Sequence, residues 1–387
     1  MAPRQSFYLE SLVEASTTST TPQVKATLTF TPDANATYWL IVSGAFVCTA
    51  AAGRATIAVH HVDAAVDLLL QGGQVKESSS PLDWIPCFGI ARLSFGSAPG
   101  EQTIEVRYAS ESDGDTTKIR DARVLVIKAD ATDQFAASDD EWQTASTSYQ
   151  DKTTLTFTPE SAGDYLVIGN ASMAMDANNT AMRGRLNHTT ASVTYGDRVW
   201  YARDAWWFQP FAVMEKLTLA ASPQTFKLQF RSNSGTLCYY RDARILALRL
   251  DAFAGHAFTS NQAVQTTTSA SDSDVLTLTH TPAAAVHAII AIGSFNTAST
   301  TVSGYLNFAK DGTNQTEFVR EGVNAAAYLH AGVVQRQTLV TSPTSWKWRA
   351  RAETAGTTVN VGNVAIAVLQ LEATPAPARR RMMALAG

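Results

Sequence analysis

The chain has 387 residues, more than one hydrophobic core normally organises, so two to four domains are expected. Its apolar fraction of 45% is ordinary for a globular protein and argues against disorder. The formal net charge of −4 supplies no strong field for nucleic acid or an anionic membrane, so a charged partner must be met by a local patch.

The amino-terminal segment carries no export signal. Residues 1–16 lack the apolar run of about 7–15 residues that a secretory signal requires, and no apolar stretch approaches the roughly 20 residues of a membrane span. We therefore expect a soluble protein that is synthesised in the cytoplasm and has no membrane partner.

An internal repeat organises the whole chain. Four landmarks recur three times in the same order: Phe7, Phe135 and Phe258; Pro32, Pro159 and Pro282; Pro99, Pro223 and Pro343; and Asp130, Asp251 and Glu372. A period of about 120 residues is that of a whole domain, not of a solenoid repeat. We predict three domains, copy 1 (1–131), copy 2 (132–252) and copy 3 (253–373), each with its own core, and an arm at 374–387.

Each copy contains several segments with strand character. In copy 1 these are residues 24–30, 38–42, 104–108 and 124–127. The third alternates apolar and polar residues, and so does its counterpart at 226–230, which indicates a strand with one face on a core and one in water. The last is apolar on both faces in every copy, which indicates a buried central strand.

These patterns predict the fold class. Short strands separated by Gly, Pro, Ser and Asn turns, without a sustained helical period, indicate an all-β protein of three tandem antiparallel β-sandwich domains. A jelly-roll-like topology is preferred. An immunoglobulin-like strand order stays open, because periodicity does not encode the order of strands in a sheet.

A charged motif precedes the last predicted strand in two copies. It consists of Arg120, Asp121 and Arg123 in copy 1 and of Arg241, Asp242 and Arg244 in copy 2, whereas copy 3 has Gly362, Asn363 and Ala365 there. An anion or sugar site is one reading. We favour a structural role in which the Asp accepts turn amides or pairs with an Arg at the start of the strand. A catalytic carboxylate would need an acid or base partner, and none recurs beside it.

The densest aromatic stretch lies at 200–208 in copy 2. Rings beside Arg and Asp suit sugar binding by stacking and hydrogen bonding. The candidate residues for binding a partner or a glycan are Trp200, Tyr201, Arg203 and Trp206. A similar stretch at 84–88 occupies the comparable place in copy 1, and this recurrence favours packing in a core or between domains.

The remaining polar side chains indicate no catalytic or metal site. Cys48, Cys87 and Cys238 share no metal or disulfide spacing, so we expect small buried hydrophobes. His60 and His61 are neighbours on a strand and face opposite sides, so they cannot easily share a metal. No nucleophile, phosphate-binding or dinucleotide motif is found, and we expect no enzymatic activity, no cofactor and no metal.

The arm at 374–387 is rich in Pro and Ala, then basic, then apolar. A free tail of this kind is usually disordered. Its stiff spacer and cationic, apolar end also suit docking on a neighbouring protein. The candidate docking residues are Arg379, Arg380, Arg381, Met382, Met383 and Leu385.

The runs at 157–159, 165–169 and 241–248 resemble β-sandwich repeats in virion proteins of tailed bacteriophages, particularly accessory head, decoration and tail proteins. The resemblance spans all three copies. It implies a non-enzymatic virion protein, made in the host cytoplasm and attached to other virion proteins on a capsid or tail. Self-association is a further partner call, and the low net charge leads us to expect no nucleic-acid partner. The alternative is a carbohydrate-binding adhesin that uses the aromatic stretch of copy 2 on host glycans.

Overall fold

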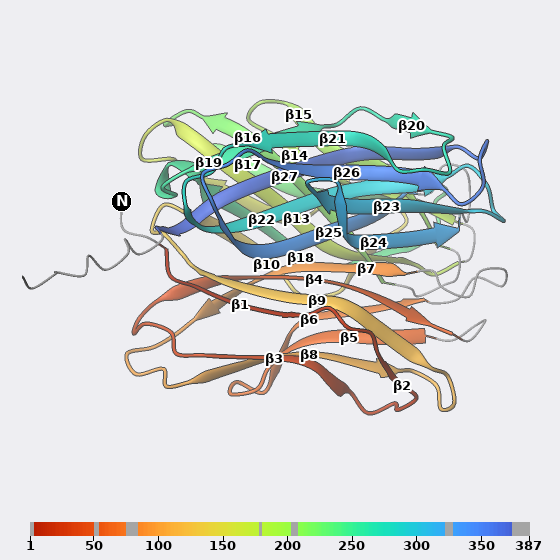
Figure 1. The fold of residues 1–387 in the computed structure, drawn as a ribbon, viewed down its shortest axis with the longest axis horizontal. Coiled ribbons are helices and arrows are strands. Elements are labelled where there is room, and N and C mark those ends of the chain that lie inside the picture. The colour runs from red at the N-terminus through yellow and green to blue at the C-terminus, as the bar shows by residue number, and fades with distance from the viewer. Residues whose placement is uncertain are drawn as a thin grey trace, which may run out of the picture.

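A computed structural model describes residues 4–49, 54–74, 84–177, 180–202, 208–321 and 328–373. Within these residues the chain forms strands and one 3-10 turn, and no helix there is long and apolar enough to cross a membrane. The strands form six antiparallel sheets, two in each copy, so the predicted all-β fold of three antiparallel sandwiches is confirmed (Figure 1).

The strands follow the repeat. Those of copy 1 are β1 (Ser6–Ser11), β2 (Ala15–Thr17), β3 (Gln23–Phe30), β4 (Thr37–Cys48), β5 (Arg54–His61), β6 (Val66–Gln74), β7 (Ile85–Ser94), β8 (Gln102–Ser110) and β9 (Thr117–Lys128). Those of copy 2 are β10 (Gln134–Ser138), β11 (Trp142–Thr144), β12 (Gln150–Phe157), β13 (Gly163–Met175), β14 (Thr180–His188), β15 (Val193–Ala202), β16 (Gln209–Leu219), β17 (Gln224–Ser232) and β18 (Cys238–Arg249), followed by the 3-10 turn Leu250–Ala252. Those of copy 3 are β19 (His256–Asn261), β20 (Gln265–Thr267), β21 (Ser273–His280), β22 (Ala285–Thr297), β23 (Ser303–Lys310), β24 (Thr313–Glu321), β25 (Leu329–Leu339), β26 (Thr344–Ala352) and β27 (Val359–Ala373).

The strand order is that of a jelly roll. In each copy we call the sheet that packs against the other copies the inner sheet and the second sheet the outer sheet. In copy 1, the inner sheet has the order β1-β9-β4-β7 with β2 beside β9, and the outer sheet has the order β3-β8-β5-β6. Because β1 and β2 both pair with β9, they form two halves of one strand, and the resulting eight strands lie four in each sheet. The inner sheets β10-β18-β13-β16 and β19-β27-β22-β25 and the outer sheets β12-β17-β14-β15 and β21-β26-β23-β24 repeat these orders.

Each sandwich buries side chains between its two sheets. In β17, Phe226 and Leu228 are fully buried, whereas Lys227 between them is half-buried on the outer side. Trp346 and Trp348 are fully buried at the matching positions of copy 3. The predicted facing of this strand is therefore confirmed. The three cysteines are also buried, as expected.

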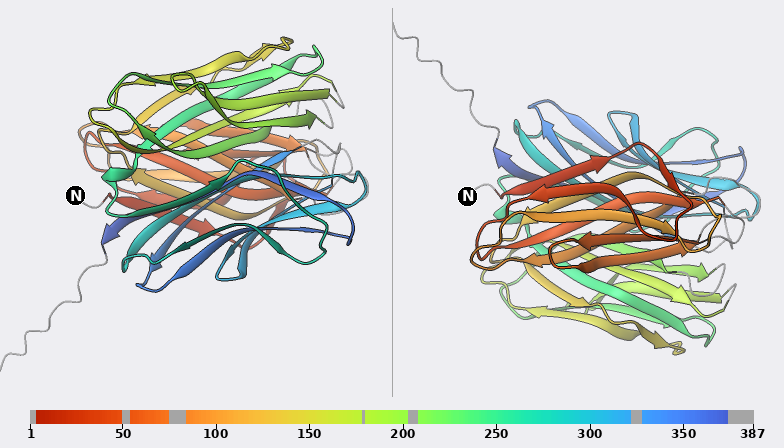
Figure 2. Two further views of the ribbon diagram at one scale, coloured as in Figure 1. Left: turned by 90° about the horizontal axis from the view of Figure 1, so that it is seen from above. Right: turned by 90° about the horizontal axis from the view of Figure 1, so that it is seen from below.

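The inner sheets bury their other faces against one another (Figure 2). In β18, Ile245 and Ala247 belong to the core of copy 2, whereas Leu246 and Leu248 belong to a second cluster, the shared core. The shared core includes Trp39, Ile41, Phe88, Leu125 and Ile127 of copy 1, Leu166, Ile168, Met214, Leu246 and Leu248 of copy 2, and Ile290, Ile292, Val334, Ala367 and Leu369 of copy 3. The expectation that each copy has only its own core is thus incomplete: the two apolar faces of the last strand serve two different cores.

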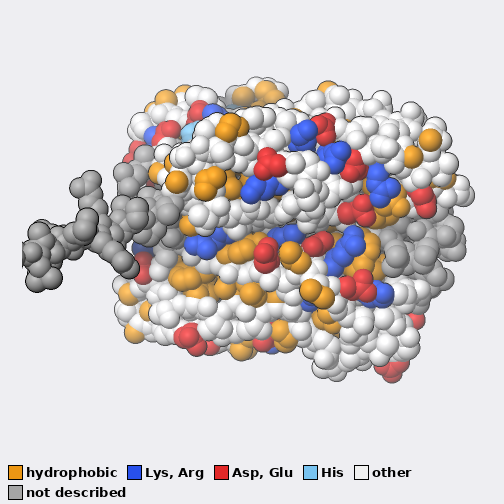
Figure 3. Space-filling view, viewed as in Figure 1, with side chains coloured by type: hydrophobic (Ala, Val, Ile, Leu, Met, Phe, Trp, Pro, Cys, Tyr) orange, Lys and Arg blue, Asp and Glu red, His pale blue; other side chains and the backbone are white. Residues whose placement is uncertain are grey.

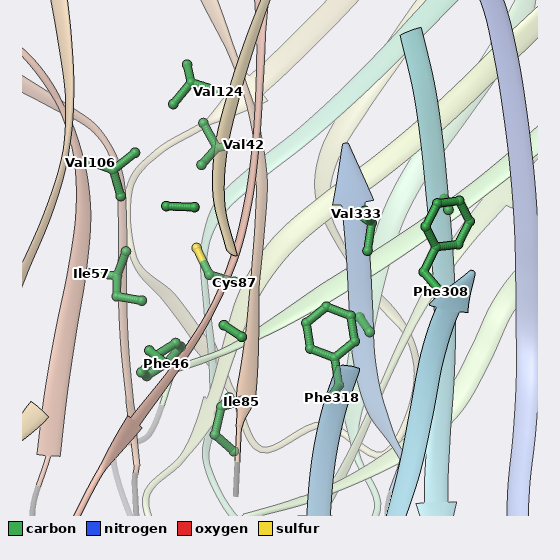
Figure 4. Close-up of a cluster of buried hydrophobic side chains, with 14 of the residues drawn as sticks. Val42, Phe46, Ile57, Ile85, Cys87, Val106, Val124, Phe308, Phe318 and Val333 are labelled. Atoms are coloured by element: carbon green, nitrogen blue, oxygen red, sulfur yellow. The ribbon is translucent and has the colours of Figure 1, made fainter. Parts of the chain in front are cut away.

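Copies 1 and 3, the most distant in sequence, are in direct contact. Figure 4 shows Val42, Ile85 and Cys87 on the side of the copy 1 group that lies nearer to Phe318 and Val333 of copy 3. All five belong to one continuous cluster of buried residues. The sandwich cores of the two copies therefore meet.

Strands β7, β16 and β25 lie where the inner sheets converge. Asn170 of β13 donates its Nδ2 to the carbonyl of Phe88 in β7 at 3.0 Å. Ser43 of β4 accepts from the amide of Val334 in β25 at 3.1 Å. Copy 2 thus binds copy 1, and copy 1 binds copy 3, through matching positions.

The two ends of the described chain lie side by side at one end of the molecule. The amide of Arg4 donates to the carbonyl of Leu371 at 2.9 Å. The Arg4 guanidinium also makes two hydrogen bonds to the buried carboxylate of Asp133, at 2.6 and 3.0 Å, and Trp39 Nε1 donates to the same carboxylate at 2.8 Å. Since Asp133 lies between β9 and β10, this ion pair ties the amino-terminal segment to the linker between copies 1 and 2.

The predicted alignment of Phe7 with Phe135 and Phe258 is wrong by one residue. Phe7 faces the core of copy 1, 4.7 Å from the ring of Phe30, whereas Phe135 and Phe258 pack on the shared core. Tyr8 is the true counterpart, because Tyr8, Phe135 and Phe258 pair with Leu125, Leu246 and Ala367. A one-residue shift reverses the face of a strand, and aromatic identity alone did not reveal it.

Candidate functional site

The Arg-Asp-Ala-Arg motif forms a β-bulge inside the last strand, which corrects the prediction of a turn at the strand's start. Asp121 has φ 54° and Asp242 has φ 51°, and pairing with the neighbouring inner strand slips at both places. Asp and Asn are enriched in this left-handed region among residues other than glycine. Asn363 keeps the bulge in copy 3, with φ 49°. Copy 3 has therefore lost the arginines and kept the backbone shape.

The motif arginines of copy 1 bind copy 3. Arg123, which is only 2% exposed, donates to Thr316 Oγ1 at 2.9 Å and to the carbonyl of Gln315 at 3.2 Å. Arg120 donates to the carbonyl of Glu317 at 2.8 Å. All three acceptors lie on β24, the edge strand of the outer sheet of copy 3. The motif is therefore an inter-domain contact.

The same contact recurs between copies 2 and 1. Arg244 is buried and donates to the carbonyl of Leu68 at 2.7 Å and to Asp139 Oδ1 at 2.6 Å. Leu68 lies on β6, the edge strand of copy 1 that corresponds to β24. Copy 2 therefore contacts copy 1 through the same strands by which copy 1 contacts copy 3.

At the third junction the arginine comes from the other side. Gly362 replaces an arginine of the motif, and a Cβ added to it would lie 2.9 Å from Nε of Arg198. Arg198 belongs to β15, the corresponding edge strand of copy 2, and it donates to the carbonyl of Gln262 in copy 3. Its guanidinium therefore occupies the space that the missing arginine of copy 3 leaves.

An aromatic ring accompanies the arginine at each junction. Trp84, Phe208 and Tyr328 directly precede β7, β16 and β25. The guanidinium of Arg120 lies 4.1 Å from the ring centre of Trp84, that of Arg241 lies 3.6 Å from Phe208, and that of Arg198 lies 5.6 Å from Tyr328. The recurring aromatic residues thus pack at the junctions, one of the two roles that their recurrence favoured.

These contacts close a ring. The last strand of copy 1 meets copy 3, that of copy 2 meets copy 1, and that of copy 3 meets copy 2. Head-to-tail contacts of this kind form a closed ring when the rotation between neighbours matches the number of units. The three sandwiches are therefore arranged about a pseudo-threefold axis, and the junction of copies 1 and 3 closes it without a linker.

Burial shifts the pKa values of the charged side chains at the junctions. It raises the pKa of Asp121, against the opposing effect of Arg123 and Arg120, and it lowers the pKa of Arg120 and Arg241. Asp121 lies 3.8 Å from Arg123 and 3.7 Å from Arg120. This arrangement pairs charges and stabilises a contact between domains. Among the described residues, no three His, Cys, Asp or Glu side chains are arranged to hold a metal ion.

The candidate glycan-binding residues do not form one surface. Trp200 is fully buried in copy 2, where its Nε1 donates to Gln209 Oε1 at 2.6 Å, so its assignment as a surface binding residue is wrong. Tyr201 is half-buried on the outer sheet. Arg203 and Trp206 lie outside the described residues.

The other predicted positions are placed as follows. His60 contacts Asp67 at 2.7 Å, and His61 contacts Gln102 at 2.9 Å, on opposite faces of β5 as expected. The docking arm, 374–387, lies outside the described residues, and its role stays a prediction. Sequence reasoning missed Arg198, for which the exchange of an arginine for Gly362 in copy 3 was the available signal.

No protein-family model and no curated protein match the sequence. Among solved structures, N-glycanase F is 9% identical, with 64% of this chain and 97% of that chain covered and a TM-score of 0.29. A structure described as the triple jelly roll fold and turret assembly of an archaeal virus is 10% identical, with 90% and 83% covered and a TM-score of 0.21. The VP2 subviral particle of infectious bursal disease virus is 8% identical, with 96% and 82% covered and a TM-score of 0.24. These TM-scores carry no argument about function, and the fold assignment rests on sheet order alone.

Proposed function

We propose that this chain is a non-enzymatic structural protein of a virus particle, built as a single-chain block of three jelly rolls. The closed ring carries the proposal. The most distinctive charged residues of the repeat, Arg123 and Arg244, are buried and bind neighbouring copies. Asp121 and Asp242 lie beside these arginines in the junctions, which supports a role in packing rather than in proton transfer.

The finer proposal is a tailed-bacteriophage protein that decorates the capsid or attaches to the head or tail as a fibre or connector. It is supported by the resemblance of 157–159, 165–169 and 241–248 to repeats of such virion proteins. Other virion proteins are the proposed partners, and the basic arm at 374–387 is the proposed anchor. Because Arg4 and Leu371 are adjacent, an anchor at either chain end leaves the opposite end of the ring to face outward.

Particles of the virus that encodes the chain provide the test. Gradient-purified particles are analysed by mass spectrometry for the chain and by electron cryomicroscopy for its position. We expect a constant number of copies per particle and a three-lobed density on the capsid or tail. Infectious particles that lack the chain altogether would refute the proposal.

A further inference from the structure

The outer sheet of copy 2 carries an unusual group of cations. Arg183 and Arg185 of β14 and Lys227 and Arg231 of β17 alternate with buried residues and therefore face outward. Arg183 pairs directly with Arg231 across the two strands. Like charges at opposing positions destabilise a sheet. Their presence therefore calls for a reason other than stability.

The described side chains on the corresponding faces of the other copies show no such excess. In copy 1, Thr56 and Ala58 occupy the positions of Arg183 and Arg185. In copy 3, three cations are matched by three carboxylates, and Figure 3 shows blue and red side chains interleaved over β21 and β26. Those residues are Lys347, Arg349 and Arg351 with Asp272, Asp274 and Glu317. Among the side chains that the structure describes on these three faces, the excess positive charge is thus found on copy 2, in a chain whose net charge is −4.

Contacts within copy 2 hold these arginines in place. The guanidinium of Arg185 lies 3.6 Å from the ring centre of Tyr149, that of Arg231 lies 5.2 Å from it, and Arg185 Nε donates to Gln229 at 2.9 Å. Among the described residues, no acceptor contacts the two terminal amino groups of Arg185. A guanidinium that is already oriented loses little freedom when it binds an anion in a bidentate manner.

A groove of about 390 Å³ adjoins this face at the junction of copies 2 and 3. One wall carries Arg183 and Asp197, which form an ion pair at 3.0 Å, and the other carries Asn296, Asn360 and Tyr328. The volume lies within the range of small-molecule sites, about 300–1,000 Å³. Amides, a carboxylate and an aromatic ring are suited to sugar hydroxyls and sugar faces.

We propose that this groove and the adjoining arginines bind an acidic polysaccharide. Sugar carboxylates pair with Arg183, Arg185 and Arg231, and sugar hydroxyls bind Asp197 and Asn360. A nucleic acid fits less well, because Asp151 and Asp197 are interleaved with the cations and repel a continuous row of phosphates. The inference is independent of attachment to a particle, since it concerns the outer surface of the ring.

The full chain is titrated calorimetrically with polygalacturonate, with dextran as the neutral polymer and single-stranded DNA as the alternative polyanion. We expect binding to polygalacturonate that weakens as salt is raised, and no binding to dextran. The double variant Arg183→Gln/Arg185→Gln should bind at least about tenfold more weakly, because it removes two charge-assisted contacts.

The matched control is Lys347→Gln/Arg349→Gln on the equivalent face of copy 3, which should bind as the unchanged chain does. Circular dichroism establishes that both variants are folded, and Arg185→Lys keeps the charge while removing the bidentate geometry. Absence of binding to polygalacturonate, equal weakening in both double variants, or tighter binding to DNA would each overturn the proposal. Incorporation into particles is measured separately and does not bear on this outcome.

Discussion

We expect Gly332→Ala to destabilise the protein and Phe88→Ala to reduce that effect. Phe88 of copy 1 is fully buried in the shared core, and Gly332 of copy 3 faces its ring. A Cβ on Gly332 would lie 2.2 Å from Cδ2 and 2.4 Å from Cγ of Phe88, so the ring must move. Overpacking of this kind costs roughly 1–3 kcal/mol.

The expected coupling between the two substitutions can be worked out from the Phe88 side chain. A buried phenylalanine removes about 150–250 Å² from water, which at about 25 cal/mol per Å² corresponds to about 4–6 kcal/mol, an upper estimate. Truncation in cores costs roughly 3–5 kcal/mol. Phe88→Ala should therefore be severe by itself. It also removes the two ring atoms nearest to Gly332, although Cβ of residue 88 stays 2.9 Å from the added Cβ. The second substitution should therefore cost less than in the unchanged protein, and the two changes should be coupled by up to roughly 1–3 kcal/mol.

Guanidinium chloride unfolding of the two single variants and the double variant, followed by tryptophan fluorescence and circular dichroism, measures the coupling. Gly96→Ala is the control, because a Cβ there meets no atom within 4 Å, and we expect less than about 0.5 kcal/mol in either background. If Gly332→Ala lowers the free energy of unfolding by the same amount with and without the Phe88 side chain, copies 1 and 3 do not meet at this contact.

Four other outcomes are expected. Phe226→Ala should cost roughly 3–5 kcal/mol and Lys227→Ala less than about 0.5 kcal/mol in denaturant titrations, and equal effects would contradict the facing of β17. Burial lowers the pKa of His330 to about 4, so the unfolded chain binds more protons between about pH 6.5 and 4. The free energy of unfolding should have its full value above about pH 6.5 and fall by up to about 3 kcal/mol toward pH 4. Thermal melts across this range should show a smaller loss for His330→Asn. Residues 132–252 alone should be β-rich by circular dichroism but associate in size-exclusion chromatography, because the apolar face that copies 1 and 3 normally bury is exposed. A stable monomer would show that copy 2 does not need the other copies to bury this face. Deletion of 375–387 should leave thermal melts unchanged and reduce incorporation into particles, and full incorporation would mean that the domain surfaces are the anchor.

The strands and their faces were predictable because burial leaves a periodic pattern in the sequence. The alternation of Phe226, Lys227 and Leu228 marked one covered face, and the apolar run at 245–248 marked two. The run could not show what covers its second face. Leu246 and Leu248 are buried by other copies, and a strand's own sequence shows only that water is absent.

The junctions were not predictable for a different reason. Arg120 and Arg244 donate to the backbone carbonyls of Glu317 and Leu68, and any residue supplies such an acceptor. For these two contacts the partner strand therefore needs no particular residue type. Trp200 is buried opposite Met182, and the sequence alone does not show this pairing.

Joining the three sandwiches in one chain changes how their surfaces are inherited. In a homotrimer, every substitution is present three times, so a junction cannot exchange a donor for a glycine without losing that donor everywhere. Here one junction has Gly362 in the last strand and takes its arginine, Arg198, from the opposite copy. The other two junctions keep the arginine of the last strand. A single chain thus retains the geometry of a symmetric assembly and lets selection act on each face separately. The excess of arginines described on copy 2 is an asymmetry that a ring of three identical chains could not accumulate.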